Sequence, residues 1–138
     1  MSTTPGTVPV TGPDPLTLDP VSRSALALFA GASGDHNPVH IDLDFARAAG
    51  FDDVFAHGML SMAYLARLLT QWVPQERIRS YGVRFAAVTP LGAKPVCSGK
   101  IVAIKDGIAT VDLLVQLEDG TVTLSGTATV ELDPEVRQ

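Results

Sequence analysis

The chain has 138 residues, with ten basic and fifteen acidic side chains and a net charge of −5. This length is typical of one domain with its own hydrophobic core, and the acidic balance argues against nucleic acid as a partner. The single cysteine, Cys97, excludes an internal disulfide framework and a cysteine-rich zinc site. We therefore expect one soluble domain in the cytoplasm.

Residues 1–15 are rich in proline, threonine and glycine, which predicts a flexible arm ahead of a single domain over residues 16–138. The arm has neither the basic nor the apolar region of a signal peptide. The most apolar segment, residues 58–73, contains Arg67 and is shorter than the roughly 20 residues of a membrane-spanning helix. No membrane span is predicted.

The next residues predict a short strand over residues 16–18 and then two helices. Asp19 followed by Pro20 is a helix start signal, so we expect a helix over residues 20–30. Asp42 is placed to cap a second helix over residues 43–49. Between the two helices, Pro38 removes an amide donor and keeps the preceding residue extended, so residues 35–40 cannot be helical throughout.

The segment of residues 58–73 predicts a long helix that is apolar around most of its circumference. Its polar side chains are three residues apart and form one narrow stripe, namely Ser61, Tyr64, Arg67 and Thr70. A helix of this kind is normally buried. We therefore expect it in the centre of the domain.

From Ile78 onward the pattern is that of β-strands. Strands are predicted from Ile78 and over residues 96–104, 108–118 and 122–132, with Asp106-Gly107 as a hairpin turn. In the last strand the apolar residues from Val122 to Leu132 alternate with outward-facing threonines, including Thr123. The predicted class is α+β: an antiparallel sheet wrapped around a long central helix, the hot-dog arrangement.

Two features of the first half of the chain are candidates for chemistry. Asp35 and His40 lie five residues apart in a loop stiffened by Pro38, which fits a general acid/base pair. Judged on spacing alone, a capping aspartate with a surface histidine is the more common arrangement. Gly58 opens the long helix, where its amide is an unpaired donor at the positive end of the helix dipole. That amide can stabilise an oxyanion, or the glycine can simply permit a sharp turn.

Other chemistries fit the residues poorly. His36, His40 and His57 do not have the spacing of a zinc-binding helix, because Pro38 separates the first two. No serine lies in a nucleophile elbow, and Cys97 lies in a strand pattern without a neighbouring base. The glycines of residues 31–34 follow no strand and lack the lysine of a phosphate-binding loop.

The residues of the loop and of the helix start together resemble a known family. The sequence GDHNPVH at residues 34–40, with HGML at residues 57–60, is similar to the signature of MaoC-like (R)-specific enoyl-CoA hydratases, also called hydratase 2, which include 3-hydroxyacyl-thioester dehydratases. The resemblance extends over about residues 16–132. It implies a hot-dog fold, usually a dimer, and reversible syn addition of water to trans-2-enoyl thioesters.

The resemblance also implies roles for individual residues. Asp35 and His40 would be the catalytic dyad that holds the water, and the Gly58 amide would polarise the thioester carbonyl. Asn37 would orient the loop and His57 would support the helix start. No metal or redox cofactor is implied; the partners would be an acyl-CoA or acyl-carrier-protein thioester and a second copy of the chain.

The chain departs from the family at Ala66, where some members carry a serine. Together with Ala63, this small residue leaves room for an acyl chain, although neighbouring leucines would fill the same space. Two alternatives stay open: a thioesterase on the same fold, and a non-catalytic acyl-binding subunit of a hetero-oligomeric dehydratase. The sequence fixes neither the acyl-chain length nor the thioester carrier.

Overall fold

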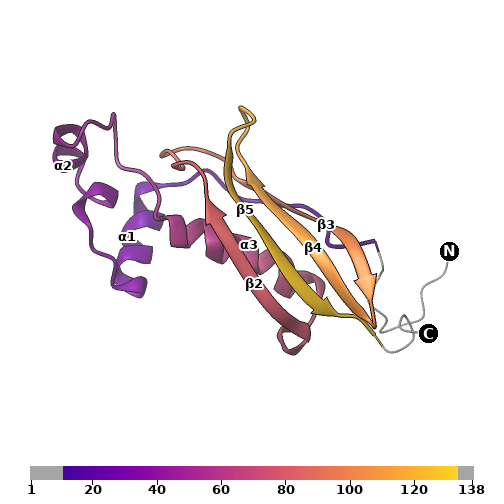
Figure 1. The fold of residues 1–138 in the computed structure, drawn as a ribbon. Coiled ribbons are helices and arrows are strands. Elements are labelled where there is room, and N and C mark those ends of the chain that lie inside the picture. The colour runs from indigo at the N-terminus through magenta and orange to yellow at the C-terminus, as the bar shows by residue number, and fades with distance from the viewer. Residues whose placement is uncertain (1–10, 134–138) are drawn as a thin grey trace.

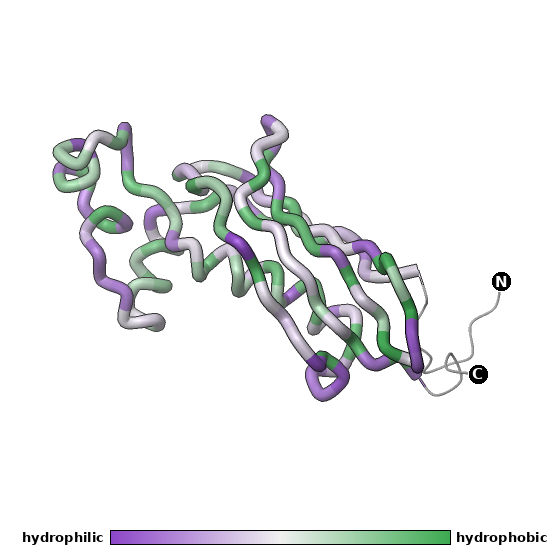
Figure 2. Tube along the Cα trace, in the orientation of Figure 1, coloured by the Kyte–Doolittle hydropathy of each residue, from purple (hydrophilic) through white to green (hydrophobic). Residues whose placement is uncertain are grey.

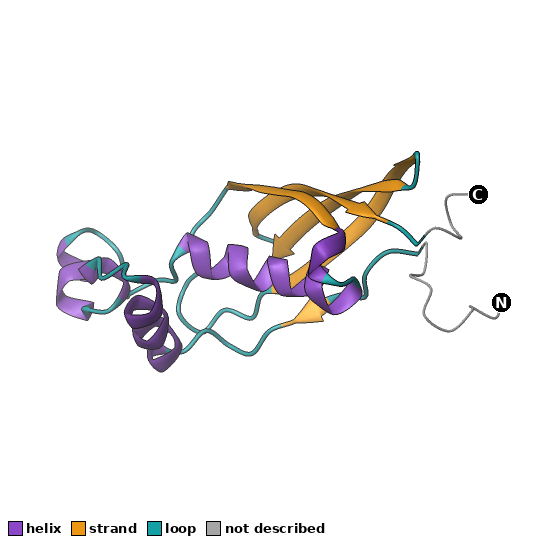
Figure 3. Ribbon diagram, turned by 90° about the horizontal axis from the view of Figure 1, so that it is seen from below, coloured by secondary structure: helices purple, strands orange, loops and turns teal. Residues whose placement is uncertain are grey.

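A five-stranded antiparallel sheet lies along one side of the long helix α3 (Gly58–Trp72) in the computed structural model, which describes residues 11–133. The strand order is β1-β3-β4-β5-β2. The strands are β1 (Leu16–Thr17), β2 (Ile78–Phe85), β3 (Val96–Lys105), β4 (Ile108–Gln116) and β5 (Val122–Glu131). Figures 1 and 3 show α3 covered by the sheet, so the predicted α+β hot-dog fold is confirmed.

Three shorter helical segments form a separate group at the N-terminal end of α3 (Figures 1 and 3). They are α1 (Arg23–Ser33), the 3-10 helix η1 (Pro38–His40) and α2 (Leu43–Ala48). We call residues 19–57, which contain them, the overhang. A further 3-10 turn, η2 (Gln75–Arg77), joins α3 to β2, and Figure 2 shows this connection as strongly hydrophilic.

Helix α3 is packed against the sheet as its composition predicts. Leu65, Leu68 and Leu69 are fully buried in one cluster with residues of β4 and β5. The central strands contribute Val111, Val115, Leu124, Ala128 and Val130 to the same cluster. The strand predicted over residues 108–118 thus has its apolar side in the core.

The hairpin between β3 and β4 has the predicted turn. Asp106 and Gly107 have φ angles of 54° and 76°, the two left-handed conformations of a type I′ turn. Aspartate tolerates this conformation better than most residues. The turn holds the register in which Lys105 faces Ile108.

The predicted start of the first helix is wrong. The N-cap of α1 is Ser22, whose hydroxyl accepts a hydrogen bond from the Ala25 amide at 3.1 Å. Asp19 is exposed in an extended segment, in which the Val21 amide donates to the Ala93 carbonyl at 2.9 Å. Because Val21 is buried in this extended pairing, the helix cannot begin before it.

The outward-facing assignment of Thr123 is also wrong. The register of β4 with β5 shifts between Val115 and Gln116, and this bulge turns Thr123 inward, where it is fully buried. Its hydroxyl donates to the Val115 carbonyl at 3.4 Å. The alternation predicted for β5 therefore holds only beyond the bulge.

The first ten residues of the predicted flexible arm lie outside the described residues. Within residues 11–15, Pro13 is buried beside Gly99, so this part of the arm packs on β3. Between residues 11 and 133, no helix has both the length and the apolar character needed to cross a bilayer.

Candidate active site

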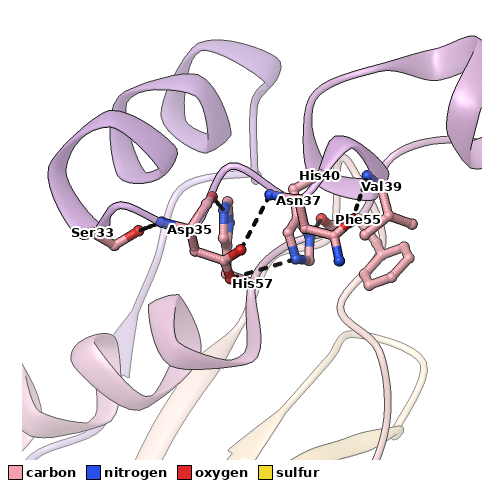
Figure 4. A network of polar contacts seen from close by, with 7 residues as sticks. All are labelled: Ser33, Asp35, Asn37, Val39, His40, Phe55 and His57. Carbon is pink, nitrogen blue, oxygen red and sulfur yellow. Dashed lines mark hydrogen bonds and ion pairs between the residues drawn. The ribbon is translucent and has the colours of Figure 1, made fainter.

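The loop that carries Asp35 is held by hydrogen bonds between side chains and backbone (Figure 4). Gly34 ends α1 in the left-handed conformation, with φ 79°, and the Asp35 amide then donates to Ser33 Oγ. Asp35 Oδ1 accepts from the Asn37 amide at 3.2 Å, and Asn37 Oδ1 accepts from the Val39 amide at 3.1 Å. Asn37 thus caps η1 and fixes the distance along the chain between the aspartate and His40.

His40 lies at the end of η1 with its ring nearly buried. Its Nδ1 is 2.7 Å from the Phe55 carbonyl oxygen. Because a carbonyl only accepts hydrogen bonds, Nδ1 carries the proton, and in the neutral ring Nε2 has a free lone pair. That Nε2 is 3.9 Å from Asp35 Oδ2, so the fold brings the two predicted dyad residues face to face.

His57 connects this loop to the start of α3. Its Nε2 donates to the backbone carbonyl of Asp35 at 3.1 Å, and its ring stacks on that of His40 with centroids 3.9 Å apart. The ring of Phe29 packs edge-on against it. His57 was predicted to support the helix start; in the structure it contacts both members of the pair.

Burial lowers the pKa of His57, and the nearby His40 lowers it further, while the hydrogen bond to the Asp35 carbonyl and the Asp35 charge act in the opposite direction. Among the described residues, no partner for the buried His57 Nδ1 is found. His57 is therefore a neutral ring near pH 7, and Nδ1 is a buried acceptor.

Gly58 is the first residue of α3, so its amide has no acceptor within the helix. A Cβ at this position would lie 2.9 Å from the Phe85 ring. The glycine is thus required by the packing of β2 against the helix start, in addition to any approach of a ligand. Beside it lies a cavity of about 320 Å³, whose lining includes Phe55, Ala56, Phe85 and Val88.

Two polar residues of this cavity were not singled out from the sequence. Ser61 and Thr89 both line it, both are buried, and their hydroxyl oxygens are 3.4 Å apart. The sequence placed Ser61 in a polar stripe of the long helix. The available signal was its spacing of three residues from Gly58, which puts both on one side of α3.

Ala63 and Ala66, the predicted acyl-pocket residues, do not line this cavity. Ala63 is exposed and Ala66 is half-buried on α3, so their role in binding an acyl chain stays a prediction. A larger, open hollow of about 930 Å³ lies against strands β2 to β5, and none of the predicted site residues lines it.

The fold also brings together a potential metal-binding set that the sequence spacing did not favour. Ligand atoms of Asp35, His40 and His57 lie within 4.8 Å of one another. A metal ion binds imidazole in the plane of the ring, yet the two rings are stacked with an angle of only 24° between them. Their lone pairs do not converge on one point, and His57 Nε2 already donates to a carbonyl. The geometry fits acid–base chemistry better than metal binding.

The chain matches the family model of the MaoC-like domain over residues 2–122. It is 31% identical over 119 residues to 3-hydroxyacyl-thioester dehydratase Z of Mycobacterium tuberculosis, covering 82% of this chain and 72% of the relative. The (R)-specific enoyl-CoA hydratase of Aeromonas caviae is 29% identical over 111 residues, or 78% of this chain and 83% of that one.

Solved structures are similar over nearly the whole chain. The (R)-hydratase from A. caviae has a TM-score of 0.81 at 25% identity and covers 93% of this chain and 99% of its own. A chain of the ChsH1-ChsH2 complex from M. tuberculosis has a TM-score of 0.78 at 25% identity, and the match covers 89% of this chain and 98% of that one. The fold and the sequence thus match the same group of hydro-lyases.

Proposed function

The chain belongs to the MaoC-like family, and we propose that it catalyses the reversible hydration of trans-2-enoyl thioesters to (R)-3-hydroxyacyl thioesters. One observation carries the proposal: His40 Nε2 and Asp35 Oδ2 face each other at 3.9 Å, and His57, which holds the Asp35 carbonyl, directly precedes Gly58 at the start of α3. A hydratase needs both a group that activates water and a hydrogen-bond donor that stabilises the negative charge developing on the thioester carbonyl oxygen.

Asp35 and His40 hold the attacking water in this proposal. The distance of 3.9 Å between their polar atoms is too long for a direct hydrogen bond and suits one water bonded to both. The lone pair on His40 Nε2 accepts from that water, and the carboxylate of Asp35 accepts its second hydrogen. The two groups share the proton transfers, so that the oxygen bonds to C3 and a proton reaches C2 from the same face.

Gly58 acts on the other end of the conjugated system. As the C3–O bond forms, the electrons of the C2–C3 double bond move toward the thioester carbonyl oxygen. The Gly58 amide donates to that oxygen, and the positive end of the α3 dipole stabilises its negative charge. Addition of the proton at C2 then restores the carbonyl.

The variant Asp35→Asn tests the dyad, with crotonyl-CoA as substrate and loss of the enoyl absorbance as the signal. We expect kcat to fall by about 10²–10⁴-fold, the usual contribution of a positioned acid or base, while the fold persists. Asp52→Asn is the matched control, because Asp52 is an exposed aspartate of the same overhang. Near-normal turnover by Asp35→Asn would refute the assignment.

The same assay separates hydration from thioester hydrolysis. A hydratase removes the enoyl absorbance without releasing free thiol, and its product is the (R)-3-hydroxyacyl thioester, so chiral analysis of that product is the second readout. Release of CoA thiol with the enoyl group intact would instead support the thioesterase alternative.

A second copy of the chain is the proposed partner, joined through the free side of β2. Strand β2 pairs only with β5 within the described sheet, and an edge strand with open hydrogen-bonding groups favours pairing. Phe85 at its end is 53% exposed, an apolar surface that such pairing would cover. Light scattering on the purified protein tests this; a monomer at the assay concentration would contradict it.

A further inference from the structure

The cavity beside Gly58 contains one more hydrogen-bond donor than its own residues use. Ser61 and Thr89 each have one hydroxyl donor, and their oxygens, 3.4 Å apart, form one hydrogen bond between them. The rest of the lining is mainly apolar, including Phe55, Phe85 and Leu124. A buried hydroxyl donor that faces an apolar cavity costs free energy unless a ligand in the cavity accepts its hydrogen bond.

The position of Ser61 on α3 directs this donor toward the helix start. Ser61 follows Gly58 by three residues, so the two share one side of the helix. Helical side chains lean toward the N-terminus and cover the preceding turn. Gly58 and Ser61 both line the cavity, so an acceptor atom bound there has both residues on the same side of the helix.

We propose that Ser61 donates a second hydrogen bond to the thioester carbonyl oxygen, beside the Gly58 amide, and that Thr89 positions it. This inference rests on the proposed hydratase function and names a further residue of that site. For Ser61 to donate to the substrate, its oxygen must accept from Thr89, so the Thr89 hydroxyl points its proton at Ser61 Oγ. Ser61 is then a catalytic residue and Thr89 a positioning residue.

The assignment has a chemical consequence at the carbonyl. Charge that moves to the oxygen during addition of water meets two fixed donors in a cavity that is largely apolar, where hydrogen bonds to an anion are strongest. Both donors also bind the ground-state carbonyl, but more weakly. Loss of Ser61 should therefore lower kcat more than it raises KM.

Ser61→Ala tests the proposal in crotonyl-CoA hydration. We expect kcat to fall by about 10²-fold, as for removal of one oxyanion donor, with little change in KM. Thr70→Val is the matched control, because Thr70 is an exposed hydroxyl residue of the same helix. Ser61→Cys keeps the side-chain size with a weak donor, and its kcat should lie between those of the wild type and Ser61→Ala. This variant separates loss of the donor from a change in packing alone.

Thr89 is tested with Thr89→Val and its conservative counterpart Thr89→Ser. The valine variant should lower kcat less than Ser61→Ala does, and the serine variant, which keeps the hydroxyl, should restore it. Equal activity of Thr89→Val and the wild type would refute the positioning role.

A spectroscopic measurement reports the carbonyl directly. In an Asp35→Asn background, which slows turnover, a bound trans-3-arylacryloyl-CoA should absorb at longer wavelength than in water, because the donors polarise its conjugated carbonyl. Addition of Ser61→Ala should reduce this red shift. A purely structural role for Ser61 would leave the shift of the bound probe unchanged.

The outcomes separate this inference from the proposed function. A wild-type protein that does not hydrate enoyl thioesters would overturn both. Wild-type activity that needs Asp35, combined with an unchanged kcat and red shift in Ser61→Ala, would overturn the role of Ser61 alone. Ser61→Ala could also keep full activity on crotonyl-CoA and lose activity only on substrates whose acyl chain carries a hydroxyl group. That result would overturn the proposal and would mean that Ser61 binds the acyl chain of the substrate instead.

Discussion

His57 shows how one buried side chain can order several groups of a site. Its Nε2 holds the backbone of Asp35, its ring stacks on His40, and its own backbone caps α3. The arrangement needs a flat, neutral ring, because a charge on His57 would be desolvated and next to His40. The dyad loop and the helix start are therefore coupled through a residue that need not touch the substrate.

The lowered pKa of His57 predicts a pH dependence of stability. The unfolded chain takes up a proton near the ordinary histidine pKa of about 6.5, whereas buried His57 resists it. The free energy of unfolding should therefore fall as pH drops below about 6.5 and be restored above it. Urea denaturation at several pH values should show a weaker dependence in His57→Gln than in the wild type. Exposed His36→Gln should keep the full dependence; equal slopes in both variants would contradict the assignment.

Gly58 gives a second prediction at the scale of single residues. Its missing side chain leaves the space in which the Phe85 ring packs. Gly58→Ala should lower the free energy of unfolding by about 1–3 kcal/mol, the usual cost of overpacking, and should reduce activity by displacing the helix start.

Gly31→Ala is the matched control for this variant. Gly31 is also helical, but an added Cβ has open space around it. Replacing a helical glycine with alanine should stabilise by about 0.5–1 kcal/mol. Thermal unfolding measures both effects; equal changes in the two variants would refute the role of Phe85.

At the scale of the element, α1 shows how capping depends on neighbouring structure. Asp19-Pro20 and Ser22 are both start signals, and the choice between them depends on the extended pairing of Val21 with Ala93. Ser22 then accepts from the Ala25 amide. This cap lies near the start of the overhang, and α1 ends directly before the loop of Asp35.

The capping assignment is tested by a pair of substitutions. Ser22→Ala should lower the free energy of unfolding by about 1 kcal/mol, the typical value of an N-cap. Asp19→Ala should change it little, because Asp19 is exposed ahead of the helix. Chemical denaturation of both variants gives the comparison, and a larger loss in Asp19→Ala would restore the sequence-based assignment.

The sequence predicted those elements whose signals are local. Such signals are the strand pattern from Ile78 onward, the turn at Asp106-Gly107 and the apolar composition of α3, each of which determines structure within a few residues. The bulge that buries Thr123 depends on pairing with β4, which no local pattern encodes. The site divides in the same way: the short loop brings Asp35 to His40, whereas the contacts of His57 with Asp35 and of Ser61 with Thr89 join residues 22 and 28 positions apart.

At the scale of the whole molecule, α3 joins two hydrophobic clusters of residues 11–133. The larger one lies between α3 and the sheet and includes Leu65 and Val111. The smaller one lies mainly in the overhang, where it includes Leu26 and Ala46, and it also contains Leu60 from the first turn of α3. Tyr64 packs against both. The two halves of the proposed site thus belong to different elements, since Asp35 and His40 lie in the overhang and Gly58 lies in the helix that the larger cluster holds.

This division predicts that the overhang can open while the sheet stays folded. Leu26→Ala removes a fully buried side chain of the smaller cluster, at a cost of roughly 2–5 kcal/mol. Because that cluster has little contact with the sheet, hydrogen exchange should accelerate mainly over residues 19–57, with the amides of β4 and β5 still protected. Hydratase activity should fall with this opening, because the dyad loses its fixed distance from α3.

Leu65→Ala is the comparison for this whole-molecule prediction, since Leu65 is equally buried but belongs to the larger cluster. Removal of the Leu65 side chain should accelerate hydrogen exchange in β4 and β5 as well as in the overhang, because the overhang packs on a helix that the larger cluster holds in place. Mass spectrometry of exchanged peptides distinguishes the two patterns. Uniform acceleration across the chain in Leu26→Ala would mean that the two clusters unfold as one unit, and the loop of Asp35 would then be as stable as the sheet.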